Sequence, residues 1–270
     1  MLAVADVSVV IPCFNSESTV IRAIESVAFQ TCLPAELIVI DDASSDGTVE
    51  VVKNFIRSYE GQMAVVLKMC LKNSGPSITR NIGWDMARHS YVAFLDSDDE
   101  WRSDKIEIQY RWMASNHQCV LSGHKCLYPG ASRADNDDMC FKKVDPWRIL
   151  VSNPFPTPSV MIKRDVSFRF DTRLKRLEDQ LLWAEISLSG HGCYFSPVPM
   201  TFVHKKAYGA GGLSASLIKM EIGELMMYKI LYEKKYISFF QFLFFEIFSI
   251  MKFARRLFTT CFDRCLSLDK

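Results

Sequence analysis

The chain has 270 residues, of which 49% are hydrophobic and 23% are charged, with 32 Lys and Arg against 31 Asp and Glu. This composition excludes a disordered tail, a collagen-like rod and a purely acidic or basic arm, and it supports a sizeable hydrophobic core. A net charge of +1 gives no electrostatic reason to expect nucleic acid as a partner. The nine cysteines form no CxxC pair, which favours reduced thiols in a cytosolic compartment over a disulfide framework.

The first hundred residues alternate short β-branched runs with helical patterns, which is typical of a parallel sheet covered on both faces. The chain begins MLAVAD, without the basic leader and long apolar stretch of a secretory signal, so we expect the fold to start there. The patterns predict strands at residues 7–12, 36–40, 64–68 and 91–95, and helices at about 18–30, 48–58 and 77–88.

This alternation weakens after residue 103. In chain order, the sequence then predicts a helix, a strand at 119–124, a loop-rich insertion at 129–156, a strand at 159–162, a helix at 179–189 and a strand at 200–203. Helical patterns dominate from about residue 214 to 262. We therefore predict one α/β domain that is followed by a helical C-terminal extension.

Acidic residues follow two of the predicted strands directly. Asp41 and Asp42 follow the second strand, and Asp96, Asp98 and Asp99 follow the fourth. In an open parallel sheet ligands bind beyond the carboxyl ends of the strands, and grouped carboxylates repel each other unless a cation lies among them. Because Mg²⁺ takes one or two carboxylates together with phosphate oxygens, the pattern indicates a metal–diphosphate site. The alternative is that these side chains only build Asx-turns and cap helices.

Four segments, in this order, resemble the motifs of family 2 glycosyltransferases with the GT-A fold. They are VSVVIPCFN at residues 7–15, LIVIDDASSDGT at 37–48, GPSITRNIG at 75–83 and FLDSDDEW at 94–101. The resemblance, which covers about residues 6–205, implies a GT-A type α/β fold with a single Rossmann-like, mostly parallel sheet and helices on both faces. It also implies transfer of a sugar from a nucleoside diphosphate donor with inversion at the anomeric carbon.

The resemblance divides the chain into two parts. Residues 1–212 correspond to the catalytic domain, with 1–105 as its nucleotide-binding half and 106–212 as its acceptor-binding half. Residues 213–270 then form a helical, amphipathic C-terminal extension.

The resemblance also implies which residues bind the donor. The loop that contains Pro12, Phe14 and Asn15 resembles the stretch that packs on the nucleobase and ribose. Asp42 resembles the carboxylate that reads the base edge, and since a carboxylate accepts the imide N–H of uracil, the implied donor is a UDP-sugar. The other nucleotide-binding residues that it implies are Asp41, Asn73, Arg80 and Asp96. Two alternatives stay open: Asp41 caps a turn, and Arg80 forms a structural ion pair with the acidic loop.

A divalent cation, Mn²⁺ or Mg²⁺, is part of the same resemblance. Asp98 resembles the principal metal ligand, and Asp96 resembles a residue that contacts ribose or metal. His204 precedes a Gly-rich segment that looks like the mobile loop that closes over the donor phosphates in relatives. At that place His204 completes the metal shell or touches the diphosphate, while Lys205 and Lys206 offset phosphate charge.

Direct displacement needs a base that removes the proton of the acceptor hydroxyl. The segment LEDQLLW at 177–183 resembles the acidic pair of the family, with Asp179 as the matched base and Glu178 beside it on the acceptor side. The start of a helix at this point predicts a lowered pKa for Asp179, although both acids would also serve simply to complement the helix dipole. Trp183 either stacks on an acceptor sugar or lies in the core.

The C-terminal extension carries nine Phe between residues 239 and 262, with a narrow polar stripe and basic residues at its end. Residues 237–251 are mostly apolar but fall short of the roughly 20 residues that span a bilayer, so we expect no transmembrane helix there. The pattern favours an interfacial helix over residues 236–264 at a membrane surface, and the competing interpretations are a dimer helix or a strap on the domain. With the resemblance, it predicts a cytoplasmic enzyme held at the inner face of the cell membrane.

These features predict an inverting transferase that builds a surface polysaccharide, such as O-antigen or capsule, on an acceptor linked to polyprenyl diphosphate. One alternative is a nucleotidyltransferase acting on sugar phosphates, which also needs metal-binding Asp residues. Such an enzyme is expected to carry a Gly-rich basic loop after its first strand, and residues 12–16, PCFNS, are not that loop. A second alternative is a non-catalytic module that binds sugar nucleotides.

Overall fold

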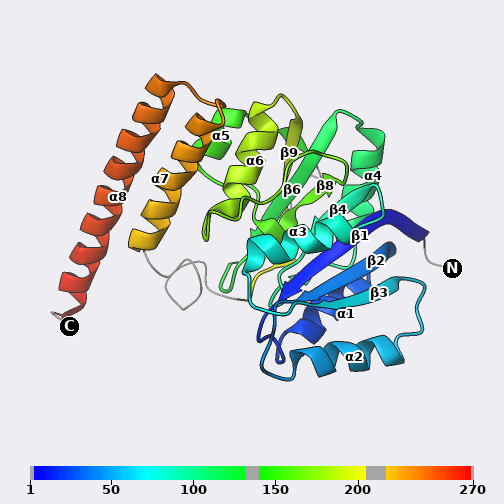
Figure 1. Cartoon of the computed structure of the whole chain (residues 1–270). Coiled ribbons are helices and arrows are strands. Elements are labelled where there is room, and N and C mark those ends of the chain that lie inside the picture. The colour runs from blue at the N-terminus through cyan, green and yellow to red at the C-terminus, as the bar shows by residue number, and fades with distance from the viewer. Residues whose placement is uncertain (1–2, 132–139, 205–216, 269–270) are drawn as a thin grey trace.

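The computed structural model describes residues 3–131, 140–204 and 217–268, with side chains except at 217 and 257–268 (Figure 1). The elements are β1 (Ala3–Cys13), α1 (Val20–Ala28), β2 (Cys32–Asp41), α2 (Thr48–Ser58), β3 (Ala64–Met69), α3 (Pro76–Met86), β4 (Tyr91–Phe94), β5 (Glu100–Trp101), α4 (Lys105–Ser115), β6 (Cys119–Leu127), β7 (Lys142–Lys143), α5 (Pro146–Val151), a 3-10 helix (Thr157–Ser159), β8 (Met161–Lys163), α6 (Glu178–Leu188), β9 (Gly192–Phe202), α7 (Leu217–Glu233) and α8 (Phe239–Leu268). Every predicted strand and helix is present. However, β9 begins well before the predicted 200–203, and the predicted loop-rich insertion contains β7 and α5.

The strands form one nine-stranded sheet in the order β3-β2-β1-β4-β8-β6-β9-β5, with β7 paired to β9. β1 lies between β2 and β4 and runs parallel to both, and β3 runs parallel to β2. These four strands all come from the first hundred residues, where the alternating pattern is strongest. The predicted α/β class is therefore confirmed, and its parallel part is the first half of the sheet.

The second half of the sheet is mixed. β8 runs antiparallel to β4 and β6, β5 and β7 run antiparallel to β9, and β6 and β9 are parallel. The expected mostly parallel arrangement therefore describes the first half of the sheet, whereas the second half contains both parallel and antiparallel pairs. An antiparallel partner needs no long crossover helix, and only β7, the short α5 and a 3-10 turn lie between β6 and β8 in the described chain.

Alternate residues of β1 face opposite sides of the sheet, and both sides are buried. Val9 and Ile11 pack in the cluster with α1, α2 and α4, and Val10 packs in the cluster with α3, α6 and α7. Helix α3 lies especially close, because a Cβ on Gly83 would lie 2.3 Å from Cγ1 of Val10. This contact holds Arg80, one turn earlier, near the strand ends.

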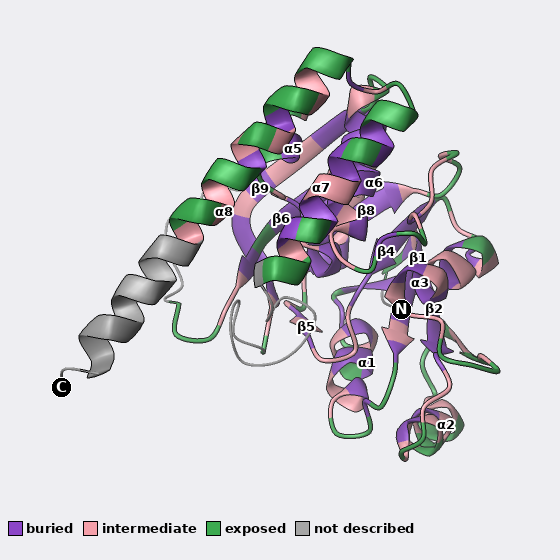
Figure 2. Ribbon diagram, turned by 60° about the vertical axis from the view of Figure 1, so that its left-hand side comes forward, coloured by how far each residue is buried: buried purple, intermediate pink, exposed green. Residues whose placement is uncertain are grey.

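The C-terminal helices stack outward from the domain, with α7 on α6 and α8 outermost (Figure 2). Phe245 of α8 stacks on Tyr228 of α7 with ring centroids 5.2 Å apart, and Ser249 donates a 2.9 Å hydrogen bond to Glu221. The predicted helical extension is therefore present, while the division at residue 212 stays a prediction. No helix in the described ranges combines the length and apolar character needed to cross a bilayer. The outer face of α8 exposes Phe240, Leu243, Phe244, Ile247, Ile250 and Met251.

Candidate functional site

A cavity of about 600 Å³ opens beyond the carboxyl ends of β1, β2 and β4. An open α/β sheet binds its ligand at this position. Several of the predicted donor-binding residues share this cavity, which we call the donor pocket. It is lined by residues 12–14, Asp42, residues 73–80, residues 96–98, Thr172, Leu174 and Lys175.

Asp42 lines the donor pocket, and its neighbour Asp41 does not. The carboxylate of Asp42 accepts the backbone N–H of Ser74 at 2.9 Å and that of Gly75 at 2.8 Å. Gly75 adopts a φ of 87°, a region that favours glycine, so both N–H groups point at one carboxylate. The buried Asp41 accepts the N–H of Ser44 at 3.1 Å and closes the turn, which agrees with the turn-capping alternative.

Some residues of the loop after β1 line the donor pocket, and others support the loop. Pro12 and Phe14 line the donor pocket, and Phe14 keeps 47% of its surface exposed beside it. Asn15 lies outside the lining and ties two loops together, because its Oδ1 accepts the N–H of Ser45 at 2.9 Å and its own N–H donates to Ser44 at 2.9 Å. We therefore assign Asn15 a supporting position instead of the predicted contact with the nucleotide.

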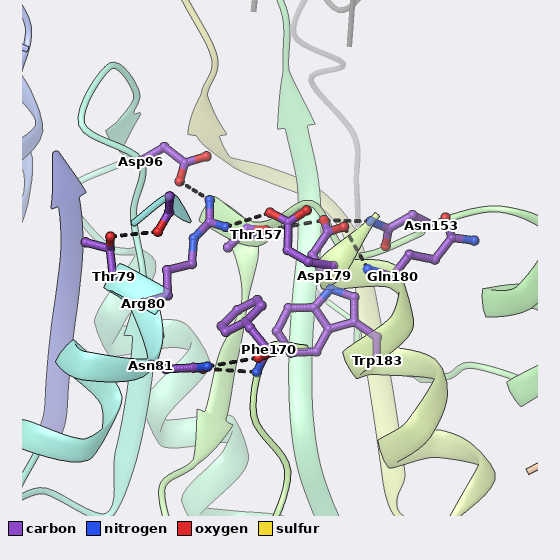
Figure 3. A network of polar contacts seen from close by, with 12 residues as sticks. Thr79, Arg80, Asn81, Asp96, Asn153, Thr157, Phe170, Asp179, Gln180 and Trp183 are labelled. Atoms are coloured by element: carbon purple, nitrogen blue, oxygen red, sulfur yellow. Dashed lines mark hydrogen bonds and ion pairs between the residues drawn. The ribbon is translucent and has the colours of Figure 1, made fainter. Parts of the chain in front are cut away.

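Arg80 connects the two acidic groups that the motifs place 82 positions apart, at Asp96 and Glu178 (Figure 3). Its Nη2 donates to Asp96 at 2.8 Å and its Nη1 donates to Glu178 at 3.0 Å. The side chain of Arg80 is 8% exposed and that of Glu178 is 9% exposed, so this pair is shielded from water, whereas Asp96 is 31% exposed. This geometry agrees with the structural ion-pair alternative. Arg80 nevertheless lines the donor pocket, where its charge acts on any bound phosphate.

Asp96 and Asp98 both line the donor pocket. The described residues contain no group of three or more His, Cys, Asp or Glu that would hold a metal alone. A hard cation needs only one or two carboxylates when phosphate oxygens complete its shell, so this donor set fits Mg²⁺ or Mn²⁺ once a diphosphate is bound. Asp98 and Asp96 are the residues that would hold it.

His204 lies beside the acidic loop through Glu100. Its Nε2 is 3.2 Å from Oε2 of Glu100, which is also 3.7 Å from Nε of Arg22. Arg22 in turn donates from Nη2 to the backbone oxygen of Asp98. His204 is therefore linked to the loop that carries Asp98, and its role as a metal ligand stays a prediction. Lys205 and Lys206 lie outside the described residues.

A second cavity, of about 540 Å³, adjoins the first, because Arg80 and Asp96 line both. We call it the acceptor pocket. Asp179 and Glu178, from the start of α6, line it together with residues of the loop before β8. Residues from α7 and α8 complete its wall: Met220, Glu224, Lys252 and Arg256.

Asp179 is held at both carboxylate oxygens (Figure 3). Its Oδ1 accepts the N–H of Gln180 at 2.7 Å, and its Oδ2 accepts from Nδ2 of Asn153 at 2.8 Å. The hydroxyl of Thr157 donates a longer hydrogen bond, of 3.3 Å, to the same Oδ2. The carboxylate is thus oriented by the protein and directed into the acceptor pocket.

The pKa of Asp179 differs from the sequence-based expectation. The helix N-terminus predicts a lowered pKa, but burial and the adjacent charge of Glu178 raise the pKa of Asp179 to about 6. The hydrogen bonds from Gln180 and Asn153, and the charge of Arg80, act in the opposite direction and do not offset the burial. A carboxylate with this pKa is mostly ionised at neutral pH and is more basic than an ordinary Asp.

Trp183 is not a surface for an acceptor sugar. Its side chain is fully buried, its indole N–H donates to the carbonyl of Phe155 at 3.0 Å, and its ring packs edge-on against Phe170. Helix α6 is buried on nearly all sides, so a residue one turn past Asp179 points into the core. The core alternative is therefore correct for Trp183, and the predicted acceptor contact is wrong.

Sequence reasoning missed the residues that hold Asp179. Asn153 and Thr157 lie in the segment NPFPT, within and directly after the predicted loop-rich insertion. The sequence did offer one signal, which is that Asn153 and Thr157 are polar residues next to prolines. Proline restricts the backbone, so polar side chains beside it are held in one direction. Arg176, which lines the acceptor pocket, was missed too, and Lys252 and Arg256, which the sequence pattern assigned to a membrane surface, line that pocket as well.

Residues 8–151, more than half of the chain, match the family model described as Glycosyl transferase family 2. A Haemophilus influenzae protein named only as a glycosyltransferase is 32% identical over 159 residues, 59% of this chain and 62% of that protein. The Escherichia coli protein WfgD, a UDP-Glc:α-D-GlcNAc-diphosphoundecaprenol β-1,3-glucosyltransferase, is 29% identical over 198 residues, 70% of this chain and 74% of WfgD.

The crystal structure of S. aureus TarS with UDP-GlcNAc has the same fold, with a TM-score of 0.66 at 21% identity. The superposition covers 83% of this chain and 66% of that one. The chain thus spans less than two thirds of the length of the H. influenzae protein and of the crystallised residues 1–349 of S. aureus TarS.

Proposed function

Because the chain belongs to glycosyl transferase family 2, we propose that it is an inverting glycosyltransferase that moves a sugar from a UDP-sugar to a hydroxyl of a saccharide acceptor in surface polysaccharide synthesis, such as O-antigen or capsule. One observation carries this proposal. Two cavities meet at Arg80 and Asp96, and one contains Asp42 and Asp98 while the other contains Asp179. A donor in the first pocket would present its sugar to a base in the second.

The donor pocket suits a nucleoside diphosphate. Phe14 offers an exposed ring beside the pocket, and Asp42 offers carboxylate oxygens that can accept a base N–H in addition to its two backbone donors. WfgD uses a UDP-sugar and TarS was crystallised with one, which supports uridine as the base. Arg80 and the start of α3 supply positive charge for the phosphates.

The residues would share the reaction as follows. Asp179 accepts the proton of the acceptor hydroxyl, whose oxygen forms a bond to the anomeric carbon on the face opposite the leaving group. The bond between that carbon and the diphosphate oxygen breaks, and UDP leaves with the electron pair. A bound Mg²⁺ or Mn²⁺ would offset the charge that develops on the diphosphate. Asn153 keeps Asp179 oriented, and Arg80 holds Asp96 and Glu178 where the two pockets join.

The acceptor is proposed to be a saccharide linked to polyprenyl diphosphate. WfgD acts on a diphosphoundecaprenol-linked sugar, and helix α8 exposes a continuous apolar face that suits the interface of an anionic bilayer. The inner side of α8 packs on α7, which agrees with the strap interpretation for that face. We propose that the outer face of α8 contacts the membrane. This arrangement supports a peripheral position at the inner face of the cell membrane.

The test is UDP release by the full chain over a panel of UDP-sugars, with Mn²⁺ or Mg²⁺, and with or without a lipid-linked acceptor. We expect release with one donor, stimulation by the acceptor, and inversion at the anomeric carbon of the product. The proposal would be contradicted if none of the UDP-sugars in the panel gave nucleotide release. A product that retains the donor's anomeric configuration would contradict it too.

A further inference from the structure

We infer that the part of the acceptor pocket walled by α7 and α8 binds a phosphate group of the acceptor, with Arg176, Lys252 and Arg256 as its cations. This inference rests on the proposed function, because it takes the pocket of Asp179 as the acceptor's place. It adds a binding site, partly in the C-terminal helices, for the phosphate of the proposed acceptor.

Two of the three cations belong to the helical wall of the pocket, and the third belongs to the loop before α6. Arg80 and Asp96 line both pockets and therefore mark the end where the two join. Lys252 and Arg256 come from α8, the helix that lies farthest from β1, β2 and β3 (Figure 1). Arg176 precedes α6 in the loop that leads to Asp179. An acceptor that spans the 540 Å³ pocket would therefore meet Arg176 and Asp179 at the start of α6, and Lys252 and Arg256 at the helical wall.

Helix α7 holds the two cations of α8 against the pocket. Nζ of Lys252 forms a short ion pair with Oε1 of Glu224, which also accepts from the hydroxyl of Tyr228 at 3.1 Å. Burial raises the pKa of Glu221, and the positive charge of Arg256 acts against that rise. The ammonium of Lys252 carries three N–H donors, and its contact with Glu224 places it at the wall of the pocket without occupying all three.

The pocket's negative charge is concentrated at the donor end. Asp96 and Asp99 follow β4, and Glu178 and Asp179 begin α6. Glu224 is the acidic lining residue of the helical wall, and it is paired with Lys252. An acceptor with a phosphate is thus repelled from the donor end and attracted to the helical wall, which fixes the direction in which it enters.

Helix α8 has a basic inner face and an apolar outer face, and together they suit a lipid-linked phosphate. Ser249, Lys252 and Arg256 lie three to four positions apart and face inward, whereas Phe244, Ile247 and Met251 are exposed. The phosphate of a lipid-linked acceptor would thus be bound where the protein meets the interface. The shared chemistry is a phosphate ester next to a sugar, and it can come from a prenyl diphosphate or from a polyol-phosphate polymer.

The experiment measures binding to the full chain saturated with UDP, by calorimetry. Three probes carry the same terminal sugar: a short-chain prenyl diphosphate conjugate, a ribitol-phosphate oligomer and a neutral oligosaccharide. The variants are Arg256→Gln and Arg176→Gln, with Arg256→Lys to restore the charge. Arg255→Gln is the matched control, because Arg255 is exposed on the same helix and is not part of the lining. Thermal unfolding of each variant reports folding separately.

We expect the wild type to bind at least one phosphate probe about tenfold or more tighter than the neutral probe, because charge-assisted hydrogen bonds are strong. Arg256→Gln and Arg176→Gln should reduce that preference several-fold, Arg256→Lys should restore part of it, and the control should keep it. Tight binding of only one phosphate probe identifies the source. Equal binding of all three probes, or loss of preference in the control as well, would overturn the inference.

Sugar transfer to the same probes separates the two proposals. Transfer at equal KM to neutral and phosphorylated acceptors would overturn the phosphate site and leave the proposed function standing. Absence of transfer with every donor and acceptor would overturn the proposed function and this inference with it.

Discussion

Asn153 donates a 2.8 Å hydrogen bond to Oδ2 of Asp179, so a residue from the loop before β8 holds one carboxylate oxygen while the N–H of Gln180 holds the other. A donated hydrogen bond stabilises the ionised carboxylate more than the protonated acid. The bond from Asn153 therefore lowers the pKa of Asp179, against the burial and the charge of Glu178 that raise it to about 6.

Replacing Asn153 should move the pH dependence of the reaction. The base works when ionised, so kcat/KM of the wild type should rise with pH through a midpoint near the pKa of about 6 of Asp179. In Asn153→Ala the ionised form loses its donor, so the pKa rises and the midpoint moves to higher pH, by on the order of one unit. The rate near pH 6 should fall more than the rate near pH 8.

The control for this change is Asn54→Ala, at an exposed position of α2. It should leave the pH profile of kcat/KM where it is in the wild type. A uniform loss of activity in Asn153→Ala at every pH, with an unmoved midpoint, would assign Asn153 a structural role only.

Asp179→Asn should remove the base and keep the shape of the site. An amide cannot accept the hydroxyl proton, so we expect kcat to fall by roughly 10²- to 10⁴-fold. The affinity for UDP should stay close to that of the wild type, because Asp179 lines the acceptor pocket and not the donor pocket. Steady-state transfer and UDP titration measure the two quantities. Wild-type transfer rates in Asp179→Asn would place the base elsewhere.

Arg80→Met should destabilise the protein strongly. It leaves the carboxylates of Asp96 and Glu178 without the cation that both contact, and Glu178 is buried. Removing one partner of a buried ion pair costs about 3–5 kcal/mol. Arg57→Met provides the contrast, because its pair with Glu50 is 66% and 60% exposed and exposed pairs contribute about 1 kcal/mol or less. Denaturant unfolding measures both, and Arg80→Met/Glu178→Gln should recover part of the loss.

Local patterns were sufficient for the first half of the fold. The β-branched runs placed β1, β2 and β4, and the acidic residues after β2 and β4 placed Asp42 and Asp98 in one pocket. These features depend on neighbours in sequence and on the rule that parallel strands share one ligand edge. The sequence alone was therefore enough to indicate the donor side.

The acceptor side depends on contacts between distant segments. Arg80 pairs with Glu178, 98 positions away, and no periodicity predicts which of its two alternatives applies. Trp183 lies in the core because α6 is buried on nearly every side, which a short helical pattern does not reveal. The pKa of Asp179 was predicted with the wrong sign, because burial outweighs the helix terminus.

Removal of divalent metal should stop donor turnover. The donor pocket offers the carboxylates of Asp98 and Asp96, and in the described residues no larger acidic, His or Cys group replaces them. We expect EDTA to abolish UDP release and Mn²⁺ or Mg²⁺ to restore it. Asp98→Asn should require about tenfold or more metal for half-maximal release, since one charged ligand is lost. Undiminished release in EDTA would contradict a metal site at these residues.

The outer face of α8 should decide membrane binding. Phe244 and Ile247 are 61% and 50% exposed, so Phe244→Glu and Ile247→Glu change the surface without opening the core. Each should reduce co-sedimentation with anionic vesicles, because a carboxylate removes apolar area and is repelled by the headgroups. Leu71→Glu is the matched control, since Leu71 is fully exposed on the loop after β3. The alternative is that this face binds a second copy of the chain. In that case vesicle binding would be unchanged in the variants, and sedimentation velocity would show a wild-type dimer that the α8 variants dissociate.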